Sequence, residues 1–89
     1  MRYASRTDGN QPDIIHALKR IGASVYYMKQ PLDLLVGYRG KNFILEVKMP
    51  REDLNGEQTN FCLRWCGSYH VVHTVEEAIA AVIGPEALK

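Results

Sequence analysis

The chain has little cysteine, no long apolar run and almost no net charge. Its two cysteines, Cys62 and Cys66, cannot build the disulfide framework of a small secreted domain. No apolar stretch approaches the roughly 18 residues of a membrane span, and no signal peptide opens the chain. We therefore expect no membrane partner and a location in the reducing cytoplasm.

The net charge of +1 is not that of a strongly basic nucleic-acid-binding protein. The charges are unevenly spread, because basic residues gather in the middle of the chain while several acids lie near its C-terminus. The basic group consists of Arg39, Lys41, Lys48 and Arg51. Surface strands commonly carry Lys and Arg, so charge alone favours a solvated surface over a DNA site.

At 89 residues the chain has room for one domain, which we expect to span residues 1–89 with a loose leader at 1–9 and a tail at 86–89. A hydrophobic content of 46% with 24% charged residues is typical of a globular protein. A domain this small buries only about 60% of its unfolded surface. Such domains often gain core by associating, which favours a homodimer.

Apolar spacing and turn residues predict an α/β protein with the element order αβββαβα, in which helices flank a mixed sheet. Each helix has an Asn or Thr at its start and an acid or Gln three residues later, as in a capping box. The predicted caps are Asn10, Asn55 and Thr74, and their partners are Asp13, Gln58 and Glu77. The expected helices cover 11–21, 56–66 and 75–83, and the expected strands cover 23–28, 32–36, 43–47 and 69–73.

The central feature is the segment Pro31–Lys48, whose two apolar runs, Leu32–Val36 and Phe43–Val47, are separated by a Gly-containing turn. This pattern is typical of a β-hairpin. Charged residues are rare in buried strands unless they are paired or bind a ligand. Three of them stand in or beside these runs: Asp33, Glu46 and Lys48.

The register of this hairpin decides which charges meet. A two-residue turn at Arg39-Gly40 sets Asp33 opposite Glu46, whereas a turn at Gly40-Lys41, or a four-residue turn starting one residue earlier, sets Asp33 opposite Lys48. All these registers put the three charges on one face, because side chains alternate with period two. A three-residue loop without a bulge would split them.

Two carboxylates on one sheet face repel each other unless a cation lies between them. Opposed Cβ atoms are roughly 5 Å apart and diagonal ones roughly 7–8 Å. Hard oxygen ligands favour Mg²⁺ or Mn²⁺ over zinc. The sequence therefore predicts a divalent metal site at Asp33 and Glu46.

The pattern Pro31…Asp33 followed by Glu46-Val47-Lys48 resembles the PD-(D/E)XK nuclease signature. Three further segments, in the same order, make the chain similar to the virus-type replication-repair nuclease (VRR-NUC) family in its compact stand-alone phage or bacterial form. They are Asp8–Asp13, Leu35–Gly40 and the series Leu54, Gln58, Phe61 and Trp65, so that the resemblance runs from about Arg6 to Gly84. One departure is Leu32, which separates the Pro and Asp that the family usually has adjacent.

This resemblance implies a restriction-endonuclease-like fold and a Mg²⁺- or Mn²⁺-dependent endonuclease that hydrolyses DNA phosphodiester bonds. It further implies selectivity for branched DNA such as Holliday junctions, a homodimer, no small-molecule cofactor, and a bacterial or phage-infected host cell. Asp33, Glu46 and the Val47 backbone carbonyl would hold the metal. Lys48 would position the attacking water or neutralise charge, and Gln58 would approach the site.

Several alternatives stay open. Asp13 is either a first-turn acid favoured by the helix dipole or, by the resemblance, an acid that reaches the metal. Gln58 either closes a capping box or serves the site. Arg39, Lys41 and Arg51 are candidate DNA contacts. A flap or nicking nuclease is the alternative enzyme, and a non-catalytic dimeric DNA-binding module is the alternative from another class.

A Cys-x3-Cys…His-x2-His pattern is the competing metal motif, formed by Cys62, Cys66, His70 and His73. Zinc pairs usually have closer cysteines on a loop. We expect Phe61, Cys62 and Trp65 to share the inward face of their helix, which favours buried, inert cysteines. His16 is expected to be a solvated helix residue.

Overall fold

The computed structural model of the protein describes residues 9–28, 33–49 and 52–84. The expected tail and, apart from Gly9, the expected leader therefore lie outside the described residues, as do Pro31 of the signature and the candidate DNA contact Arg51. Within this part the predicted element order αβββαβα is confirmed. The elements are α1 (Gln11–Arg20), β1 (Ser24–Tyr27), β2 (Leu34–Tyr38), β3 (Lys41–Val47), α2 (Gly56–Arg64), β4 (Tyr69–Val72) and α3 (Val75–Ile83).

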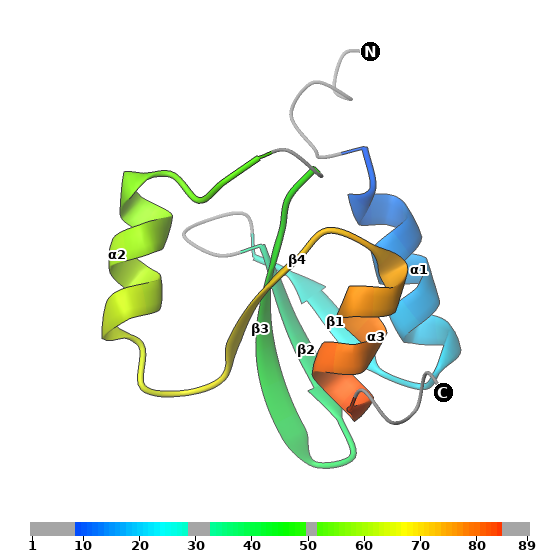
Figure 1. The fold of residues 1–89 in the computed structure, drawn as a ribbon. Helices are drawn as coiled ribbons and strands as arrows, with labels where there is room; N and C mark the ends of the chain where they lie inside the picture. Colours follow the sequence, from blue (N-terminus) through cyan, green and yellow to red (C-terminus); the bar gives the residue numbers. More distant parts are fainter. Residues whose placement is uncertain (1–8, 29–32, 50–51, 85–89) are drawn as a thin grey trace.

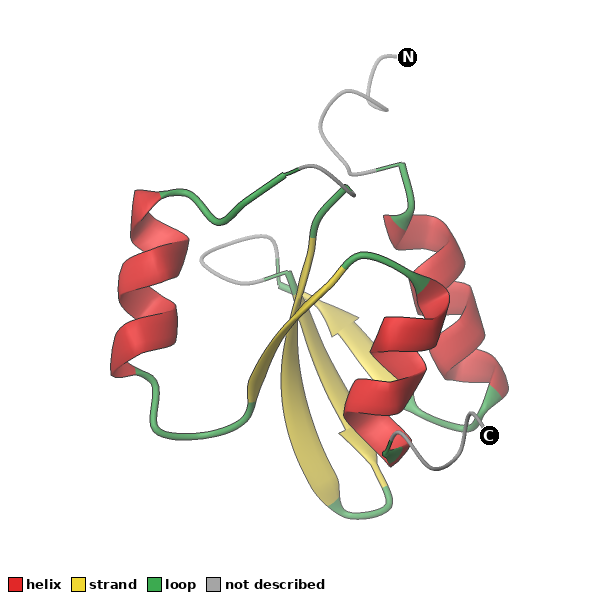
Figure 2. Ribbon diagram, viewed as in Figure 1, coloured by secondary structure: helices red, strands yellow, loops and turns green. Residues whose placement is uncertain are grey.

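The four strands form one mixed sheet in the order β1-β2-β3-β4. The first three are antiparallel neighbours, and β4 runs parallel to β3. A parallel pair needs a crossover, which α2 supplies between β3 and β4. Figure 1 shows α2 alone on one side of the sheet and α1 with α3 on the other, and Figure 2 shows the same layers by element type. The predicted α/β class with a mixed, helix-flanked sheet is confirmed.

The hairpin of β2 and β3 closes through a two-residue turn at Arg39-Gly40, because Tyr38 pairs with Lys41. Both turn residues have positive φ, 51° for Arg39 and 81° for Gly40. Positive φ at both central positions is the mark of a type I′ turn, whose twist matches that of the flanking strands. Of the registers open to the sequence, this one places position 33 opposite position 46.

The hydrophobic core lies between the sheet and the pair α1 and α3. Strand residues that point to this side are buried against one face of each helix. The core consists of Ile14, Leu18, Ala23, Leu34, Val36, Leu45, Val47, Val72, Ala78 and Val82. The end of α1 is closed as predicted by Gly22, whose φ is 95°. Gly22 N donates to Lys19 O at 3.0 Å and Ala23 N to Leu18 O at 3.1 Å, which is a Schellman motif.

The α2 side of the sheet is covered much less completely. No residue of α2 is buried, and the side chain of Leu63 is 77% exposed. The expectation that Cys62 and Trp65 face inward is wrong, because Cys62 is exposed and Trp65 is 46% exposed. The helix ends at Arg64 and the backbone of Trp65 is already extended, so this side chain leaves the helical face.

The two cysteines are free, exposed thiols, so the prediction of buried, inert cysteines is wrong. Phe61 alone of the expected inward group is half-buried. Its ring stacks on Trp65 at 5.1 Å between centroids and is tilted against Tyr69 at 5.3 Å. Phe61 of α2 therefore packs against Trp65, just beyond the helix, and against Tyr69 of β4, and these rings do not form a second buried core.

Asn10 stands at the start of α1 but does not cap it. Its backbone has helical angles (φ −89°, ψ −9°), whereas a capping residue is extended, and its side chain makes no cap hydrogen bond. Instead Nδ2 donates to the carbonyl oxygens of Lys48 at 3.0 Å and His73 at 2.6 Å. The sequence predicts that the Asn10 side chain accepts a hydrogen bond from the first turn of α1. In the structure it donates to two distant carbonyls instead.

The cap of α3 is confirmed in part. Glu77 N donates to Thr74 Oγ1 at 3.0 Å, as expected. The Glu77 carboxylate accepts from His73 N at 2.6 Å and lies 3.1 Å from His73 Nδ1, one residue before the predicted partner. No helix in the described part of the chain is long and apolar enough to cross a membrane.

Candidate metal centre

Glu46 is a carboxylate inside the sheet. Its side chain is only 2% exposed, although it ends in an ionisable carboxyl group. Leu45 and Val47, its neighbours on β3, belong to the core between the sheet and α1 with α3. Because strand side chains alternate, Glu46 points to the opposite face, toward α2. Burying a carboxylate is costly unless hydrogen bonds or a ligand compensate for its lost hydration.

Asp33 lies directly before β2. Extending the observed pairing of Leu34 with Leu45 by one position sets Asp33 opposite Glu46. Asp33 Oδ2 accepts from Val47 N at 2.9 Å, and the Asp33 carbonyl accepts from Met28 N at 2.7 Å. The residue therefore holds the corner where β1, β2 and β3 meet, and its carboxylate lies beside the end of β3.

Gln58 fulfils both of the roles that the sequence left open. Gln58 N donates to Asn55 Oδ1 at 2.9 Å and Asn55 N donates to Gln58 Oε1 at 3.0 Å, which completes the predicted capping box. Gln58 Nε2 donates to Glu46 Oε2 at 2.7 Å. One amide thus caps α2 with its oxygen and contacts the buried carboxylate with its nitrogen.

The backbone around Val47 and Lys48 is held from both sides. In an extended strand the N–H and C=O of one residue point to the same neighbour. Val47 N bonds the Asp33 carboxylate, so the Val47 carbonyl is directed to the same side of β3 as Asp33. Lys48 N donates to Val72 O at 3.0 Å, and Lys48 O accepts from Asn10. The side chain of Lys48 is partly exposed and follows directly on this corner.

Tyr69 is a residue of this region that sequence reasoning missed. It pairs with Ile44, and strand alternation puts its side chain on the face of Glu46. Burial, followed by the charges of Glu46, Cys62 and Asp33, raises the pKa of the Tyr69 hydroxyl to about 12. The alternation of side chains along β4 could have indicated which face of the sheet Tyr69 occupies. Nothing in the sequence indicates that its hydroxyl lies near the carboxylates.

Asp13 is not brought into this group. It is an exposed residue of α1, the layer on the other side of the sheet from α2 (Figure 1). Among residues 9–28, 33–49 and 52–84 no three His, Cys, Asp or Glu side chains are placed to share a metal ion. The Cys-x3-Cys…His-x2-His alternative likewise forms no such group in this part of the chain. His16 is exposed, as predicted.

Of the candidate DNA contacts, Arg39 and Lys41 lie at the tip of the hairpin, and Arg51 lies outside the described residues. Arg39 and Lys41 are exposed at its tip, where the Arg39 guanidinium lies 5.2 Å from the Tyr38 ring centroid. Lys41 and Glu46 are five positions apart on one extended strand, which is about 17 Å. The basic group expected from the sequence is therefore not one continuous patch, since Lys48 stands at the opposite end from the tip.

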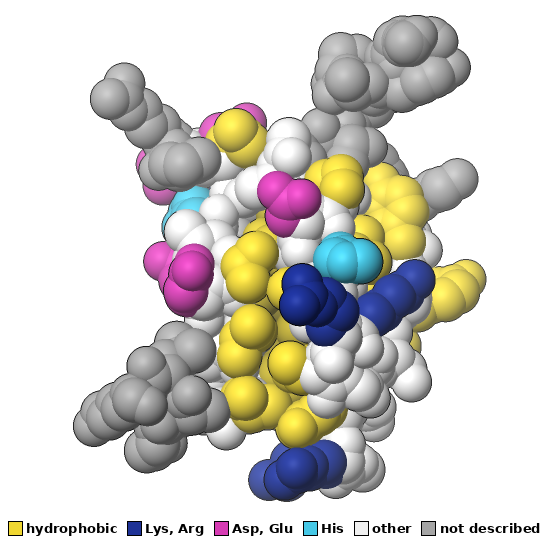
Figure 3. Space-filling view, turned by 90° about the vertical axis from the view of Figure 1, so that its right-hand side faces the viewer, with side chains coloured by type: hydrophobic (Ala, Val, Ile, Leu, Met, Phe, Trp, Pro, Cys, Tyr) yellow, Lys and Arg dark blue, Asp and Glu magenta, His cyan; other side chains and the backbone are white. Residues whose placement is uncertain are grey.

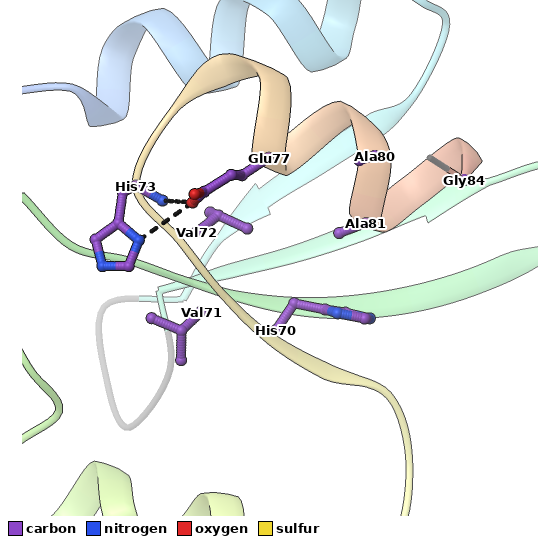
Figure 4. Close-up of a pocket in the computed structure, with 8 residues that line it drawn as sticks. All are labelled: His70, Val71, Val72, His73, Glu77, Ala80, Ala81 and Gly84. Carbon is purple, nitrogen blue, oxygen red and sulfur yellow. Dashed lines mark hydrogen bonds and ion pairs between the residues drawn. The ribbon is translucent and has the colours of Figure 1, made fainter. Parts of the chain in front are cut away.

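An open hollow of about 610 Å³ lies elsewhere, between β4 and α3. Figure 4 shows His73 turned toward Glu77 while His70 points away from both. The small side chains of Ala80 and Ala81, together with Gly84, leave the space open. Its lining includes one carboxylate, and this hollow does not supply the paired acids that a Mg²⁺ site needs.

The donor chemistry at the end of β3 fits a hard divalent cation. Asp33 and Glu46 supply carboxylate oxygens, and the Val47 carbonyl supplies a third oxygen directed to the side of Asp33. Mg²⁺ usually takes only one or two protein carboxylates and keeps several waters, so a three-residue oxygen set is sufficient. Thiol and imidazole groups, which zinc prefers, are absent from this set.

No family model, curated protein or solved structure matches the chain. The function therefore has to follow from the chemistry of these residues and from the resemblance seen in the sequence.

Proposed function

We propose that the protein is a Mg²⁺- or Mn²⁺-dependent endonuclease that hydrolyses DNA phosphodiester bonds, with a PD-(D/E)XK fold of the VRR-NUC type. The observation that carries the proposal is the buried Glu46 carboxylate, set opposite Asp33 and followed two residues later by Lys48. Burying an acid in a strand costs stability unless it is compensated, and Gln58 supplies one compensating hydrogen bond to Glu46. A divalent cation would offset both the burial of Glu46 and the repulsion between the two acids.

Asp33, Glu46 and the Val47 carbonyl would hold the cation. When bound, the metal supplies a more acidic water and stabilises negative charge at the reacting phosphorus. Asp33 keeps its orientation through Val47 N, and Glu46 keeps its own through Gln58 Nε2. These hydrogen bonds preorganise the ligands, so that less reorganisation is needed when substrate arrives.

Lys48 would position the attacking water or neutralise developing negative charge, because its backbone is fixed beside the ligands. Gln58 reaches the same carboxylate from α2 and would orient Glu46. Arg39 and Lys41, at the far tip of the hairpin, would contact phosphates of the DNA and not the reacting group. Duplex DNA carries a phosphate charge about every 1.7 Å along its axis, so one substrate spans both ends of the hairpin.

The proposed working unit is a homodimer acting on branched DNA such as a four-way junction, where two sites meet two strands. The thin cover on the α2 side supports a partner there. Large hydrophobic side chains are exposed on this side, namely Tyr26 at 67%, Leu35 at 37%, Leu63 at 77% and Trp65 at 46%. The opposite layer carries a second apolar band between α1 and α3, visible in Figure 3 with acidic side chains mainly on its left and basic ones mainly on its right.

Light scattering at micromolar concentration tests the dimer. We expect a mass near twice that of the 10.1 kDa chain. Leu63→Lys should shift the mass toward one chain, because a charge in an apolar interface is costly. His16→Lys places the same charge on exposed α1 and should leave the dimer intact. A parent of one-chain mass that still cleaves both strands of a junction contradicts the homodimer.

A cleavage assay tests the activity. The substrates are a four-way junction, a flap, a nicked duplex and a linear duplex, each with Mg²⁺, Mn²⁺ and Ca²⁺. We expect cleavage of the junction with Mg²⁺ and Mn²⁺, binding without cleavage in Ca²⁺, and no cleavage by Glu46→Ala. Preference for the flap or the nicked duplex would support the alternative nuclease. Full activity of Glu46→Ala would contradict the proposed site.

A non-catalytic dimeric DNA-binding module is the second candidate. One observation favours it: no third acidic, His or Cys side chain joins the pair Asp33 and Glu46 in the described part of the chain. Such a module has no need of metal. It would bind DNA equally well in EDTA and in millimolar Mg²⁺, and its Glu46→Ala variant would bind DNA as the parent does.

A further inference from the structure

The Tyr69 hydroxyl is buried and has no hydrogen-bond partner among the described residues. Buried polar groups are almost always hydrogen-bonded, so an exception calls for an explanation. Leaving a donor unpaired in the interior lowers the stability of the folded state. The chain therefore keeps a hydroxyl at a place where phenylalanine would pack equally well.

The position of Tyr69 in the sheet places its side chain on the same face as Glu46. Tyr69 lies on β4 beside Ile44 of β3, and Ile44 shares a face with Glu46. The Tyr69 ring rests against Phe61, with 5.3 Å between centroids and an angle of 55°. Phe61 in turn stacks on Trp65. This packing holds the ring, so the hydroxyl has a defined place on the carboxylate side of the sheet.

The charges around the hydroxyl agree with that placement. Burial is the main cause of its raised pKa of about 12, and the negative charges of Glu46 and Asp33 act in the same direction. The phenol consequently stays protonated at neutral pH and is available as a donor. A donor without an acceptor thus lies near two acids that are acceptors when ionised.

We propose that Tyr69 is a positioning residue of the metal centre, whose hydroxyl donates a hydrogen bond to the Glu46 carboxylate when Glu46 binds a divalent cation. The inference rests on the proposed function. In the structure Glu46 Oε2 is turned toward Gln58. Binding a cation re-aims a carboxylate, and metal-bound carboxylates are themselves usually hydrogen-bonded by neighbouring residues.

The two hydrogen-bond donors would then hold Glu46 from two elements. Gln58 reaches it from α2, and Tyr69 would reach it from β4. Removing a group that supports a metal ligand in this way typically weakens metal binding by about 10- to 100-fold. The hydroxyl would thus contribute nothing in the metal-free protein and would act only when the cation is present.

Tyr69→Phe tests this without disturbing the ring packing against Phe61. The matched control is Tyr27→Phe, because Tyr27 is an exposed tyrosine of the same sheet that pairs with the core residue Leu34 and so lies on the face opposite to Glu46. Mn²⁺ binding is measured by calorimetry, and thermal unfolding is followed with and without Mn²⁺. We expect Tyr69→Phe to unfold at the same or a higher temperature without metal, to bind Mn²⁺ about tenfold more weakly, and to gain less thermal stability from it. Tyr27→Phe should match the parent in all three.

A role in packing alone predicts the reverse pattern. Tyr69→Phe would then unfold at a lower temperature without metal and bind Mn²⁺ as tightly as the parent, and either this pattern or an unchanged affinity overturns the inference. A parent that binds no Mn²⁺ overturns the proposed function, and the inference with it. The two failures are distinguishable, since the first leaves metal binding and DNA cleavage by the parent intact.

Discussion

The Gln58 amide joins α2 to the buried Glu46 carboxylate through a hydrogen bond of 2.7 Å, while its oxygen accepts from Asn55 N in the capping box of the same helix. A residue in the first turn of α2 therefore also orients the acid in the middle of the sheet. Because α2 has no buried residue, this polar link is a main determinant of where the helix lies. Stability and site geometry are coupled at one side chain.

The two roles of Gln58 can be separated by mutation. Asn55→Ala removes the cap acceptor and should cost about 1 kcal/mol of unfolding free energy while leaving the Glu46 contact. Gln58→Met keeps the bond from Gln58 N to Asn55 Oδ1 but removes the acceptor of Asn55 N together with the donor to buried Glu46, and should cost roughly 1–3 kcal/mol. Urea unfolding measures both. Equal losses in the two variants would show that the bond to Glu46 adds no stability.

Asp33 should tolerate loss of charge but not loss of its acceptor oxygen. In Asp33→Asn the amide oxygen still accepts from Val47 N, so we expect nearly unchanged stability but at least about 10²-fold slower cleavage. Asp33→Ala leaves Val47 N unpaired and should cost about 1 kcal/mol in addition. Urea unfolding and single-turnover cleavage are the measurements. An Asp33→Asn protein that cleaves at the parent rate would exclude Asp33 as a ligand.

Lys48 should affect the chemical step more than DNA binding. Lys48→Ala is expected to lose at least about 10²-fold in cleavage, as for an electrostatic or proton-transfer group. Its binding of uncleaved junction DNA in Ca²⁺ should weaken much less. Lys41→Ala, at the far tip of the hairpin, should show the opposite pattern at saturating DNA. If binding and cleavage by Lys48→Ala fall by the same factor, Lys48 is only a phosphate contact.

Glu77 should make stability depend on acid pH. Its hydrogen bond from His73 N is the main cause that lowers its pKa below the ordinary 4.5. A lowered folded pKa means that the ionised carboxylate stabilises the protein above about pH 4.5 and that this gain is lost as the pH falls through the folded value. The effect is small because Glu77 is exposed.

Comparing urea unfolding at about pH 7 and about pH 3.5 tests this. Glu77→Gln should lose less stability between the two pH values than the parent does. Glu76→Gln removes the same charge from the same turn of α3 and should behave as the parent. An identical pH dependence in Glu77→Gln and the parent would mean that the His73 bond does not favour the charged form.

Sequence reasoning succeeded where local chemistry decides structure. The Asn55 and Gln58 pair and the Gly22 terminus both depend on residues close in sequence. The alternation of side chains along β3 correctly predicts that Glu46 and its core neighbours point to opposite faces of the sheet. The choice among the possible hairpin registers could not be made, because each of them buries the same apolar side chains.

The failures concern contacts between distant parts of the chain. Asn10 is of a residue type that commonly caps helices, but its side-chain amide instead donates to two carbonyls that follow β3 and β4. Trp65 has helical spacing from Phe61, yet the helix ends one residue earlier and exposes it. Tyr69 gains its surroundings only through the parallel pairing of β4 with β3, which no local pattern encodes.

The Asn10 amide also has a kinetic consequence. It joins carbonyls that are 38 and 63 residues further along the chain, at the ends of β3 and β4. Closing loops of that length is unfavourable until the intervening elements are in place, so these bonds should form after the folding transition state. Interactions absent from that state leave the folding rate unchanged and slow unfolding. We therefore expect the Asn10 side chain to lengthen the lifetime of the native protein. Asn10→Ala should unfold faster than the parent and fold at the same rate.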